Sequence, residues 1–147
     1  MTETTLLAVP NVSEGRDEEL IAEIARAFDA RRLDVHSDPD HNRTVITLAG
    51  PPGRLAHTVL EGARVAVERL DISRHQGEHP RIGVLDVAPI VYLDDGARGA
   101  ACAEALVLGD LLGSELKLPV FLYGALGGGR TRAELRRGGP ERLAERL

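Results

Sequence analysis

Apolar residues along the chain alternate between short runs typical of strands and longer stripes at helical spacing. The clearest stripe contains Leu20, Ile24 and Phe28, and it follows an acidic segment that suits the first turn of a helix. The clearest strand signal is the β-branched run over residues 43–49. The predicted elements are, in order, a strand over 6–10, a helix over 16–30, strands over 33–35 and 43–49, a helix over 55–70, a strand over 84–93, a helix over 97–117 and a strand over 119–123.

The order of these elements, βαββαβ followed by αβ, predicts the fold class. The first six match the split βαβ, ferredoxin-like pattern, and the last two form an added α-β unit. We therefore expect an α+β fold with a mixed sheet and with helices packed mainly on one face. A chain of 147 residues, 43% of them hydrophobic, has the size and the core of a single domain over 1–147. Residues 125–147 are expected to form a loop and a poorly packed terminal helix, which could be mobile.

Three local features refine this picture. Residues 11–15 are turn formers, so we expect them to lie outside the first strand. Pro89, inside the predicted strand over 84–93, implies a sheet edge or a bulge. The predicted inner face of the helix over 97–117 consists of Cys102, Leu106, Gly109, Gly113 and Leu116.

Composition and charge argue against several classes of function. The net charge is −5 and the chain has two Phe, two Tyr and no Trp, so we expect no nucleic-acid partner. No apolar run approaches membrane-spanning length and the N-terminus lacks the layout of a signal peptide, so we expect a cytoplasmic protein without a membrane partner. The single cysteine, Cys102, excludes an internal disulfide and a cysteine-based zinc site, and its apolar surroundings predict a buried, inert thiol.

Residues 74–81 are the first place to look for chemistry. Eight residues hold two imidazoles, two guanidiniums and a carboxylate, directly before an apolar run. His79 is the leading candidate, because Pro80 stiffens its backbone and an imidazole can take up and return a proton near neutral pH. The alternative is a surface histidine in an ordinary loop.

The spacing of His75 and His79 raises the question of a metal site. Two histidines four residues apart match a pair of ligands on a helix. Gly77 and Pro80 disfavour a helix there, however, and the sequence offers no evident third ligand. We therefore expect no metal, and we expect His75 to be structural or exposed to solvent.

Other polar segments allow a structural and a functional interpretation. Residues 38–43 could orient a ligand or could be ordinary hairpin chemistry, and residues 11–14 could simply cap a helix. The glycines at 127–129 do not follow the phosphate-loop spacing and predict a flexible loop. Asp86 and Glu78 are candidate partners for an imidazole.

Three stretches together carry a resemblance to a known family. They are residues 9–16 (Val-Pro-Asn-Val-Ser-Glu-Gly-Arg), residues 38–45 (Asp-Pro-Asp-His-Asn-Arg-Thr-Val), and residues 77–83 (Gly-Glu-His-Pro-Arg-Ile-Gly) with 86–89 (Asp-Val-Ala-Pro). In this order they resemble the N-terminal subdomain of glutamate formiminotransferases, and residues 119–124 and 135–138 fit as well. The likeness runs across nearly the whole chain, and it implies the same ferredoxin-like α+β fold.

The resemblance also implies an activity and a catalytic residue. The family transfers a formimino group from N-formimino-L-glutamate to tetrahydrofolate, a co-substrate, in histidine degradation and one-carbon metabolism. Its catalytic histidine lies in the motif at residues 77–81, so the role would fall to His79. One imidazole could remove the proton from the attacking folate nitrogen and protonate the departing glutamate nitrogen.

Substrate contacts follow from the same resemblance. The glutamate carboxylates call for arginine, which can pair with a carboxylate through two hydrogen bonds, and the candidates are Arg43 and Arg81. Asn11 and Asn42 are the candidate polar positioning groups. The residues that would bind the folate are unknown at this stage.

The greater length of the family members suggests that this chain works with a partner. They carry a second subdomain after this one and bind their ligands between the two, whereas this sequence ends at Leu147. We therefore expect a formiminotransferase-like enzyme whose cleft is completed by a second chain, either its own copy in a homo-oligomer such as a homodimer or a separate partner with the C-terminal subdomain. Two alternatives stay open: a non-catalytic module that binds folate or another small anion as a dimer, and an interaction protein that docks through its sheet face or the helix over 97–117.

Overall fold

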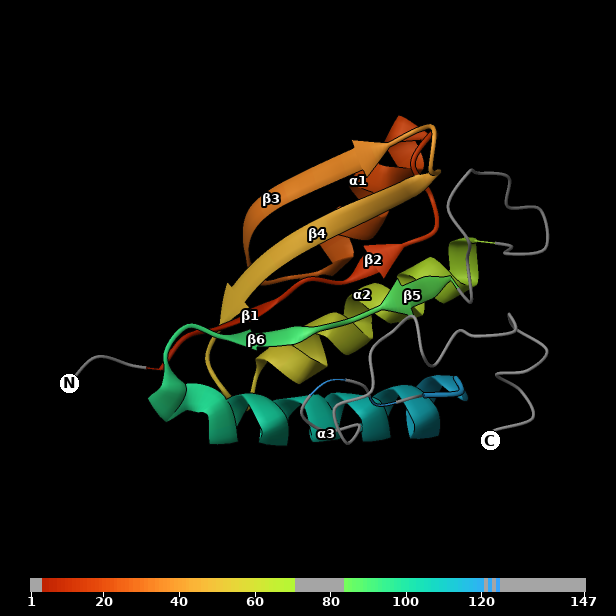
Figure 1. Cartoon of the computed structure of the whole chain (residues 1–147). Coiled ribbons are helices and arrows are strands. Elements are labelled where there is room, and N and C mark those ends of the chain that lie inside the picture. Colours follow the sequence, from red (N-terminus) through yellow and green to blue (C-terminus); the bar gives the residue numbers. More distant parts are fainter. Residues whose placement is uncertain (1–3, 71–83, 121, 123, 125–147) are drawn as a thin grey trace.

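The computed structural model describes residues 4–70, 84–120, 122 and 124 of the chain. An antiparallel sheet and three α-helices form this part of the protein (Figure 1). The elements are β1 (Leu6–Ala8), β2 (Asn11–Val12), α1 (Glu18–Ala27), β3 (Arg31–Asp38), β4 (Arg43–Gly50), α2 (Leu55–Arg69), β5 (Leu85–Val87), β6 (Ile90–Tyr92), the short 3₁₀ helix η2 (Asp95–Ala97) and α3 (Arg98–Leu116). The predicted alternation of strands and helices is confirmed as far as α3, within the described residues.

The strand β4 lies in the middle of the sheet. It pairs with β3 along one side and with β1 and β2 along the other, while β6 and β5 pair in turn with β1 and β2. All of these pairings are antiparallel, so the expectation of a mixed sheet is wrong for the described strands. The reason is the position of β4, which separates β2 from β3. The two strands that α1 connects run in the same direction but are never neighbours.

The segment between β1 and β2, which contains Pro10, remains hydrogen-bonded to the sheet. The backbone N–H of Ile46 donates to the carbonyl of Pro10 (3.0 Å), and that of Val9 donates to the carbonyl of Pro89 (3.0 Å). The prediction of a turn at residues 11–12 is therefore wrong, because long-range backbone hydrogen bonds outweigh the local turn preference and form β2. The outer strand is interrupted between β5 and β6, where Pro89 predicts an edge or a bulge.

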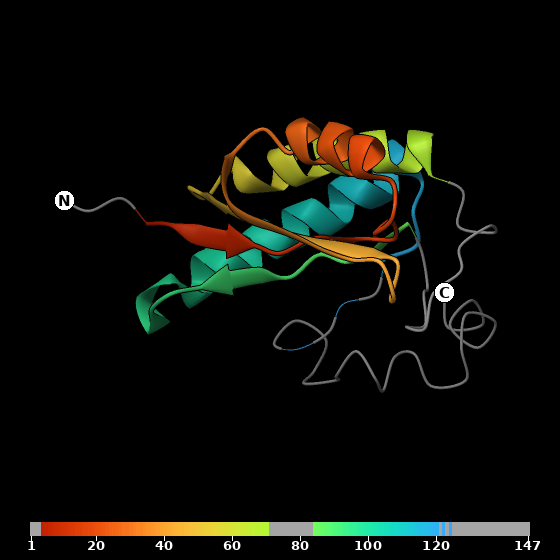
Figure 2. The same ribbon diagram turned by 90° about the horizontal axis from the view of Figure 1, so that it is seen from above.

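The hydrophobic core lies between the sheet and the helices. Side chains alternate between the two faces of a strand, and the members of β1 and β4 that face the core are almost fully buried: Leu6, Ala8, Ile46 and Leu48. Helices α1 and α2 cover this face, with α3 alongside α2 and β6 (Figure 2). The opposite face of the sheet carries no helix among the described elements.

Helix α1 is shorter than its apolar stripe predicts. The carboxylate of Asp17 accepts a hydrogen bond from the backbone N–H of Leu20 (3.1 Å), so the helix begins at Glu18 and not at residue 16. It ends at Ala27, and the next residue, Phe28, packs its buried ring against α2. A methyl group at Gly62 of α2 would overlap that ring, so the glycine is what allows the two helices to approach.

The predicted inner face of α3 is wrong. Leu106 is 50% exposed, and Cys102, Gly109, Gly113 and Leu116 are only partly buried. The thiol predicted to be buried is therefore half-buried. The residues that face the protein are Ala101, Glu104, Leu108 and Leu112. The strand predicted over 119–123 is not found in the described residues of that segment, and residues 125–147 lie outside the described part.

Glu104 explains why a different face of α3 from the predicted one points toward the protein interior. Its carboxylate accepts hydrogen bonds from the backbone N–H groups of Gly53 (2.7 Å) and Ala56 (2.8 Å), at the start of α2. Arg54, the N-cap residue of α2, makes no side-chain capping bond. A carboxylate at a helix N-terminus satisfies unpaired N–H groups and suits the helix dipole. An acidic residue is therefore buried where hydrophobic periodicity predicts an exposed one.

Candidate functional site

The loop after β2 packs tightly against the β3–β4 hairpin at one end of the sheet. Gly15 is the point of closest approach, because a methyl group there would overlap the backbone of Asp38 and Arg43. Its N–H donates a 2.8 Å hydrogen bond to Oδ1 of Asn42, a buried residue. Asn42 has a φ of 52°, in the left-handed region that asparagine adopts more readily than most residues. One side chain thus both shapes the hairpin and fixes the loop to it.

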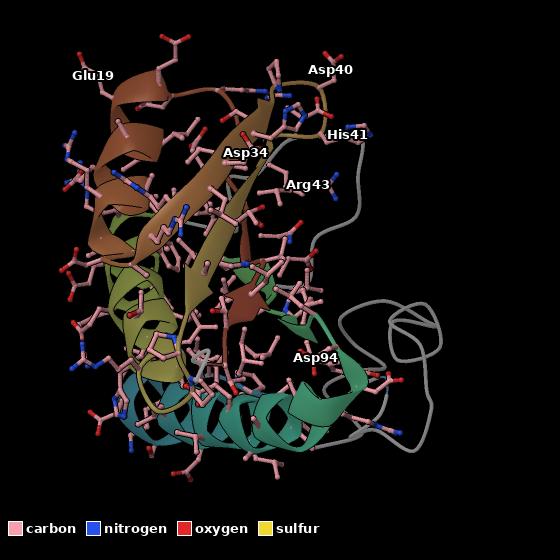
Figure 3. All side chains as sticks on the ribbon, turned by 90° about the vertical axis from the view of Figure 1, so that its left-hand side faces the viewer. Glu19, Asp34, Asp40, His41, Arg43 and Asp94 are labelled. Atoms are coloured by element: carbon pink, nitrogen blue, oxygen red, sulfur yellow. The ribbon has the colours of Figure 1, made fainter. Side chains whose placement is uncertain are left out.

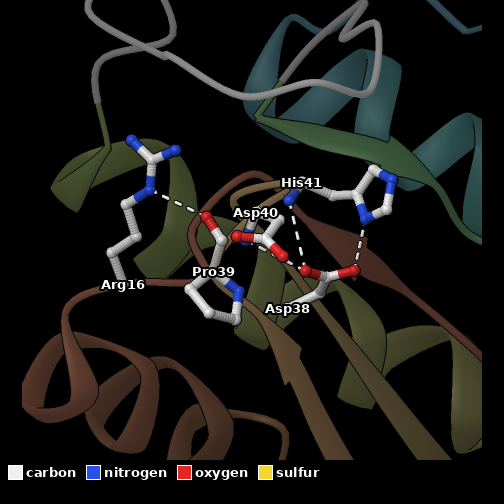
Figure 4. A network of polar contacts seen from close by, with 5 residues as sticks. All are labelled: Arg16, Asp38, Pro39, Asp40 and His41. Carbon is white, nitrogen blue, oxygen red and sulfur yellow. Dashed lines mark hydrogen bonds and ion pairs between the residues drawn. The ribbon is translucent and has the colours of Figure 1, made fainter.

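A second connection between these segments runs through Thr44, which is fully buried. Its hydroxyl donates to the carbonyl of Glu14 (2.5 Å) and lies 3.0 Å from the hydroxyl of Ser37. Ser37 is the donor in the second bond, because the single hydroxyl proton of Thr44 is already used. Arg16 adds a hydrogen bond from Nε to the carbonyl of Pro39 (2.8 Å; Figure 4). The β3–β4 hairpin is therefore bonded to the segment before α1 through both Thr44 and Arg16.

Asp38 organises the tip of the hairpin (Figure 4). Its Oδ1 accepts hydrogen bonds from the backbone N–H groups of Asp40 (3.0 Å) and His41 (3.2 Å), and its Oδ2 accepts one from Nδ1 of His41. The bond from the imidazole, followed by that from the backbone of His41, lowers the pKa of Asp38 below its ordinary value of 3.8. Asp38 in turn fixes the proton of a neutral His41 ring on Nδ1.

Arg43 and Asn11 lie on the face of the sheet away from the helices. Asn11 is directly opposite Val45, and Arg43 is two residues from Val45 along β4, so all three side chains share one face. Figure 3 shows Arg43 on the side of β4 opposite α1. The Nε atom of Arg43 is buried and has no hydrogen-bond partner among the described residues. Such a group is costly unless something binds it, and an anion is what a guanidinium binds.

The segment that carries His79 joins the described fold beside the same loop. The carbonyl of Val84, the first described residue after that segment, accepts a 2.9 Å hydrogen bond from the backbone N–H of Ser13. The next strand, β5, pairs with β2 so that Val87 lies opposite Asn11. The three sequence stretches that carry the family resemblance therefore meet, through their described parts, at one end of the sheet.

The structure brings some of the predicted site residues together and leaves others untested. Arg43 and Asn11 share the open face, although Nδ2 of Asn11 donates to its own strand at the carbonyl of Val9 (2.8 Å). Asn42 is engaged with the loop at Gly15 and does not belong to that face. His79, Arg81, His75, Glu78 and residues 127–130 lie outside the described residues. Asp86 lies in β5 and is partly buried.

The capping interpretation of residues 11–14 applies to Glu14. Its Oε2 accepts hydrogen bonds from the backbone N–H groups of Arg16 (2.9 Å) and Asp17 (3.1 Å), just before α1. Within the described residues there is no group of three or more His, Cys, Asp or Glu side chains placed to hold a metal ion. No described helix is long and apolar enough to cross a membrane.

Sequence reasoning missed the residues that hold this end of the sheet in place. Gly15 and Thr44 do so through contacts with residues far away in the chain, and no local pattern marks either one. A weak signal does exist, because a glycine next to a helix start and a threonine within a β-branched strand are both compatible with close packing. Only the register of β4 against β2 and β3 identifies their partners.

Comparison with known proteins places the chain in a family. The family described as "Formiminotransferase domain, N-terminal subdomain" matches residues 5–147. The formimidoyltransferase-cyclodeaminase of Sus scrofa is 42% identical over 151 residues, which cover 95% of this chain and 27% of the pig protein. The glutamate formimidoyltransferases of Thermoplasma acidophilum (40% identical) and Streptococcus pyogenes (33% identical) match over 78% of this chain and over 39% and 40% of their own lengths. The chain thus spans about a quarter to two fifths of these relatives, and it belongs to the formiminotransferase family, to which it corresponds as the N-terminal subdomain.

Proposed function

We propose that this chain is the N-terminal subdomain of a folate-linked formiminotransferase and that it transfers a formimino group from N-formimino-L-glutamate to tetrahydrofolate. Relatives named formimidoyltransferase and glutamate formimidoyltransferase match it at 33–42% identity, which supports a transferase of this kind. The ferredoxin-like arrangement, a single domain over 1–147 and a cytoplasmic location are part of the same proposal. No metal enters the proposed reaction.

The observation that carries the proposal is the buried, unpaired Nε of Arg43 on the open sheet face. A substrate with two carboxylates needs a fixed cation, and a guanidinium holds a carboxylate through two parallel hydrogen bonds. The side chain starts from a β-strand whose hairpin is bonded to the neighbouring loop, so the backbone from which it extends is held in place before the substrate binds. Arg81 is the second proposed carboxylate contact, from the segment that joins β5.

His79 is the proposed general acid/base. The folate nitrogen attacks the formimino carbon, and the imidazole accepts the proton that this nitrogen loses. The same imidazole then protonates the glutamate nitrogen as the C–N bond to glutamate breaks, so the proton is returned and glutamate leaves. Asn11 on the open face and Asn42 in the turn of the β3–β4 hairpin are the proposed polar positioning groups.

The proposed reaction needs a second surface opposite Arg43. The described elements leave the sheet face of Arg43 without a covering helix, and the relatives are at least about twice as long as the matched region. A second chain, either another copy or one that carries the C-terminal subdomain, would close the site over the substrates. Enclosure excludes water and strengthens the contact between the guanidinium and the carboxylate.

A turnover assay tests this function. Purified protein would receive N-formimino-L-glutamate and tetrahydrofolate, alone and together with a separately produced C-terminal subdomain of a family member, and formation of the formimino-folate would be followed. We expect turnover in at least the second mixture and a loss of about 10²-fold or more in His79→Ala. A His75→Ala variant, four residues away in the same segment, is the matched control and should retain activity. Absence of turnover in both mixtures, or full activity of His79→Ala, would refute the proposal.

A non-catalytic anion-binding module is the second candidate, and the same Arg43 favours it. Such a module would bind folates or glutamate derivatives without turnover. Calorimetric titration separates the two functions: binding that Arg43→Gln abolishes, together with no turnover in either mixture, would support the module. Binding together with turnover supports the enzyme.

A further inference from the structure

Asp38 and Arg43 are directly opposite each other where the β3–β4 hairpin turns. Opposite residues of two antiparallel strands point to the same face of the sheet, with their Cβ atoms about 4.5–5.5 Å apart. Opposite charges in this arrangement attract each other and stabilise a sheet. The described residues nevertheless hold no ion pair between Asp38 and Arg43. Nε of Arg43 is buried without a hydrogen-bond partner, and Asp38 pairs with His41 instead.

Both carboxylate oxygens of Asp38 are engaged within the turn (Figure 4). Oδ1 accepts from the backbone N–H groups of Asp40 and His41, and these two bonds do not depend on the side chain of residue 41. Oδ2 is held by Nδ1 of the His41 imidazole. The groups that lower the pKa of Asp38 are His41 and then the backbone of Asp40, and Arg43 is not among them. The imidazole is thus the side chain that decides where Oδ2 points.

His41 lies on the same side of the hairpin as Arg43, away from α1 (Figure 3). Its side chain is 38% exposed, so the imidazole packs loosely and its main described side-chain contact is the bond to Asp38. Without that ring, Oδ2 would lose its donor while the backbone still held Oδ1 in place. The released oxygen would then be opposite an unpaired guanidinium. A carboxylate bound there would occupy the group that the substrate carboxylate needs.

We propose that His41 is a positioning residue, which holds the Asp38 carboxylate away from Arg43 and so keeps the guanidinium open for a carboxylate of the substrate. His41 acts through Asp38 and needs no contact with the substrate. The consequence for substrate binding rests on the proposed function, whereas the arrangement of the three side chains is a property of the ligand-free protein. The two parts can therefore be tested separately.

The nuclear magnetic resonance signal of the Arg43 Nε–H group in the ligand-free whole chain tests the arrangement. His41→Ala should shift this signal, because Oδ2 of Asp38 becomes its acceptor. Adding Asp38→Asn to that variant removes the competing charge and should return the signal to near its wild-type position. His57→Ala removes an exposed imidazole from α2 and is the matched control, which should leave the signal unchanged. An unshifted signal in His41→Ala, or a shift that persists in the double variant, would overturn the proposal.

Steady-state kinetics in the mixture that shows turnover test the consequence for the substrate. His41→Ala should raise KM for N-formimino-L-glutamate about two- to fivefold, the effect of one competing cross-strand ion pair, and should leave kcat unchanged. His41→Asn keeps an N–H donor at the position of Nδ1 and should retain the wild-type KM. A merely structural role would not separate KM from kcat in this way.

The two experiments distinguish failure of this inference from failure of the proposed function. An unchanged KM in His41→Ala, with an active wild type, would overturn the role of His41 in substrate binding. A wild type without turnover would refute the proposed function, and the Arg43 signal of the ligand-free variants would still decide whether His41 holds Asp38 away from Arg43.

Discussion

The backbone N–H of Gly15 donates a hydrogen bond to Oδ1 of Asn42, 27 residues away in the chain. This bond fixes the loop after β2 to the β3–β4 hairpin, directly before Arg43 begins β4. Because Arg43 is the group on which the proposed function depends, Gly15 and Asn42 act on the site through position and not through contact with a substrate. Substitution of Gly15 or Asn42 should therefore be detected first as a lower free energy of unfolding.

Gly15→Ala should destabilise the protein by about 1–3 kcal/mol, the usual effect of forcing extra atoms into a packed position. The added methyl group would overlap the backbone of Asp38 and Arg43 and push the hairpin away from the loop. Urea denaturation monitored by circular dichroism measures the change. Gly99→Ala is the control, because nothing lies near that position of α3 and alanine favours a helix, so its stability should equal or exceed the wild type.

Asn42 contributes both a left-handed backbone conformation and a side-chain acceptor for Gly15, and two variants separate these contributions. Asn42→Gly keeps the left-handed backbone but leaves the N–H of Gly15 without its acceptor, at a cost of about 1–3 kcal/mol. Asn42→Ala loses the acceptor as well and adds backbone strain of roughly 1 kcal/mol. The free energy of unfolding should therefore fall in the order wild type, Asn42→Gly, Asn42→Ala. Equal stabilities of the two variants would show that the backbone conformation of residue 42 contributes nothing.

Glu104→Ala should cost about 1–3 kcal/mol, because it leaves the N–H groups of Gly53 and Ala56 unpaired at the start of α2. Glu115→Ala on the same helix removes an exposed carboxylate that lies 3.9 Å from Arg64, and it should change stability by less than about 0.5 kcal/mol. Thermal unfolding of both variants provides the comparison. Similar losses in the two would contradict the capping role of Glu104.

Acid should weaken the hairpin through Asp38. The pKa of its carboxyl is lower in the folded protein than its ordinary value of 3.8, so the unfolded chain binds more protons around that pH. The stabilisation is therefore present above pH 3.8 and is lost as the pH falls through the folded pKa. Asp38→Asn removes this part of the pH dependence, so the urea midpoint of the variant should fall less steeply with acid than that of the wild type. Asp110→Asn, at an exposed position of α3, is the control and should keep the wild-type slope.

Local sequence patterns were sufficient to predict the elements that bury one continuous apolar stripe. The stripe containing Ile24 predicts α1, and the β-branched run of β4 predicts a buried strand, both as found. The exact start of α1 depends on a single side chain, Asp17, and the continuation of the first strand through Pro10 depends on a bond from Ile46. Such details are set by individual contacts and not by periodicity.

Features that depend on distant residues could not be predicted. The inner face of α3 is set by Glu104, whose partners lie about 50 residues earlier, at the start of another helix. The all-antiparallel pairing of the described strands depends on β4 lying between β2 and β3, which no local signal contains. In the candidate site, the residue types at positions 11 and 43 suggested polar contacts, but only the strand register shows that Asn11 and Arg43 share a face. The assignment of His79 rests on the family motif, outside the described residues.

The role proposed for Arg43 is tested most directly by the nuclear magnetic resonance signal of its Nε–H group during titration with N-formimino-L-glutamate. The signal can be assigned by its absence from Arg43→Lys. Because Nε is buried and unpaired, a carboxylate that binds there should shift its resonance strongly and saturably, whereas the Nε–H of Arg16, already bonded to Pro39, should not move. A saturable shift at Arg43 alone is the predicted result. Binding of the ligand that leaves the Arg43 signal unchanged, or no binding in the presence or absence of a C-terminal subdomain, would contradict a substrate-binding role of Arg43.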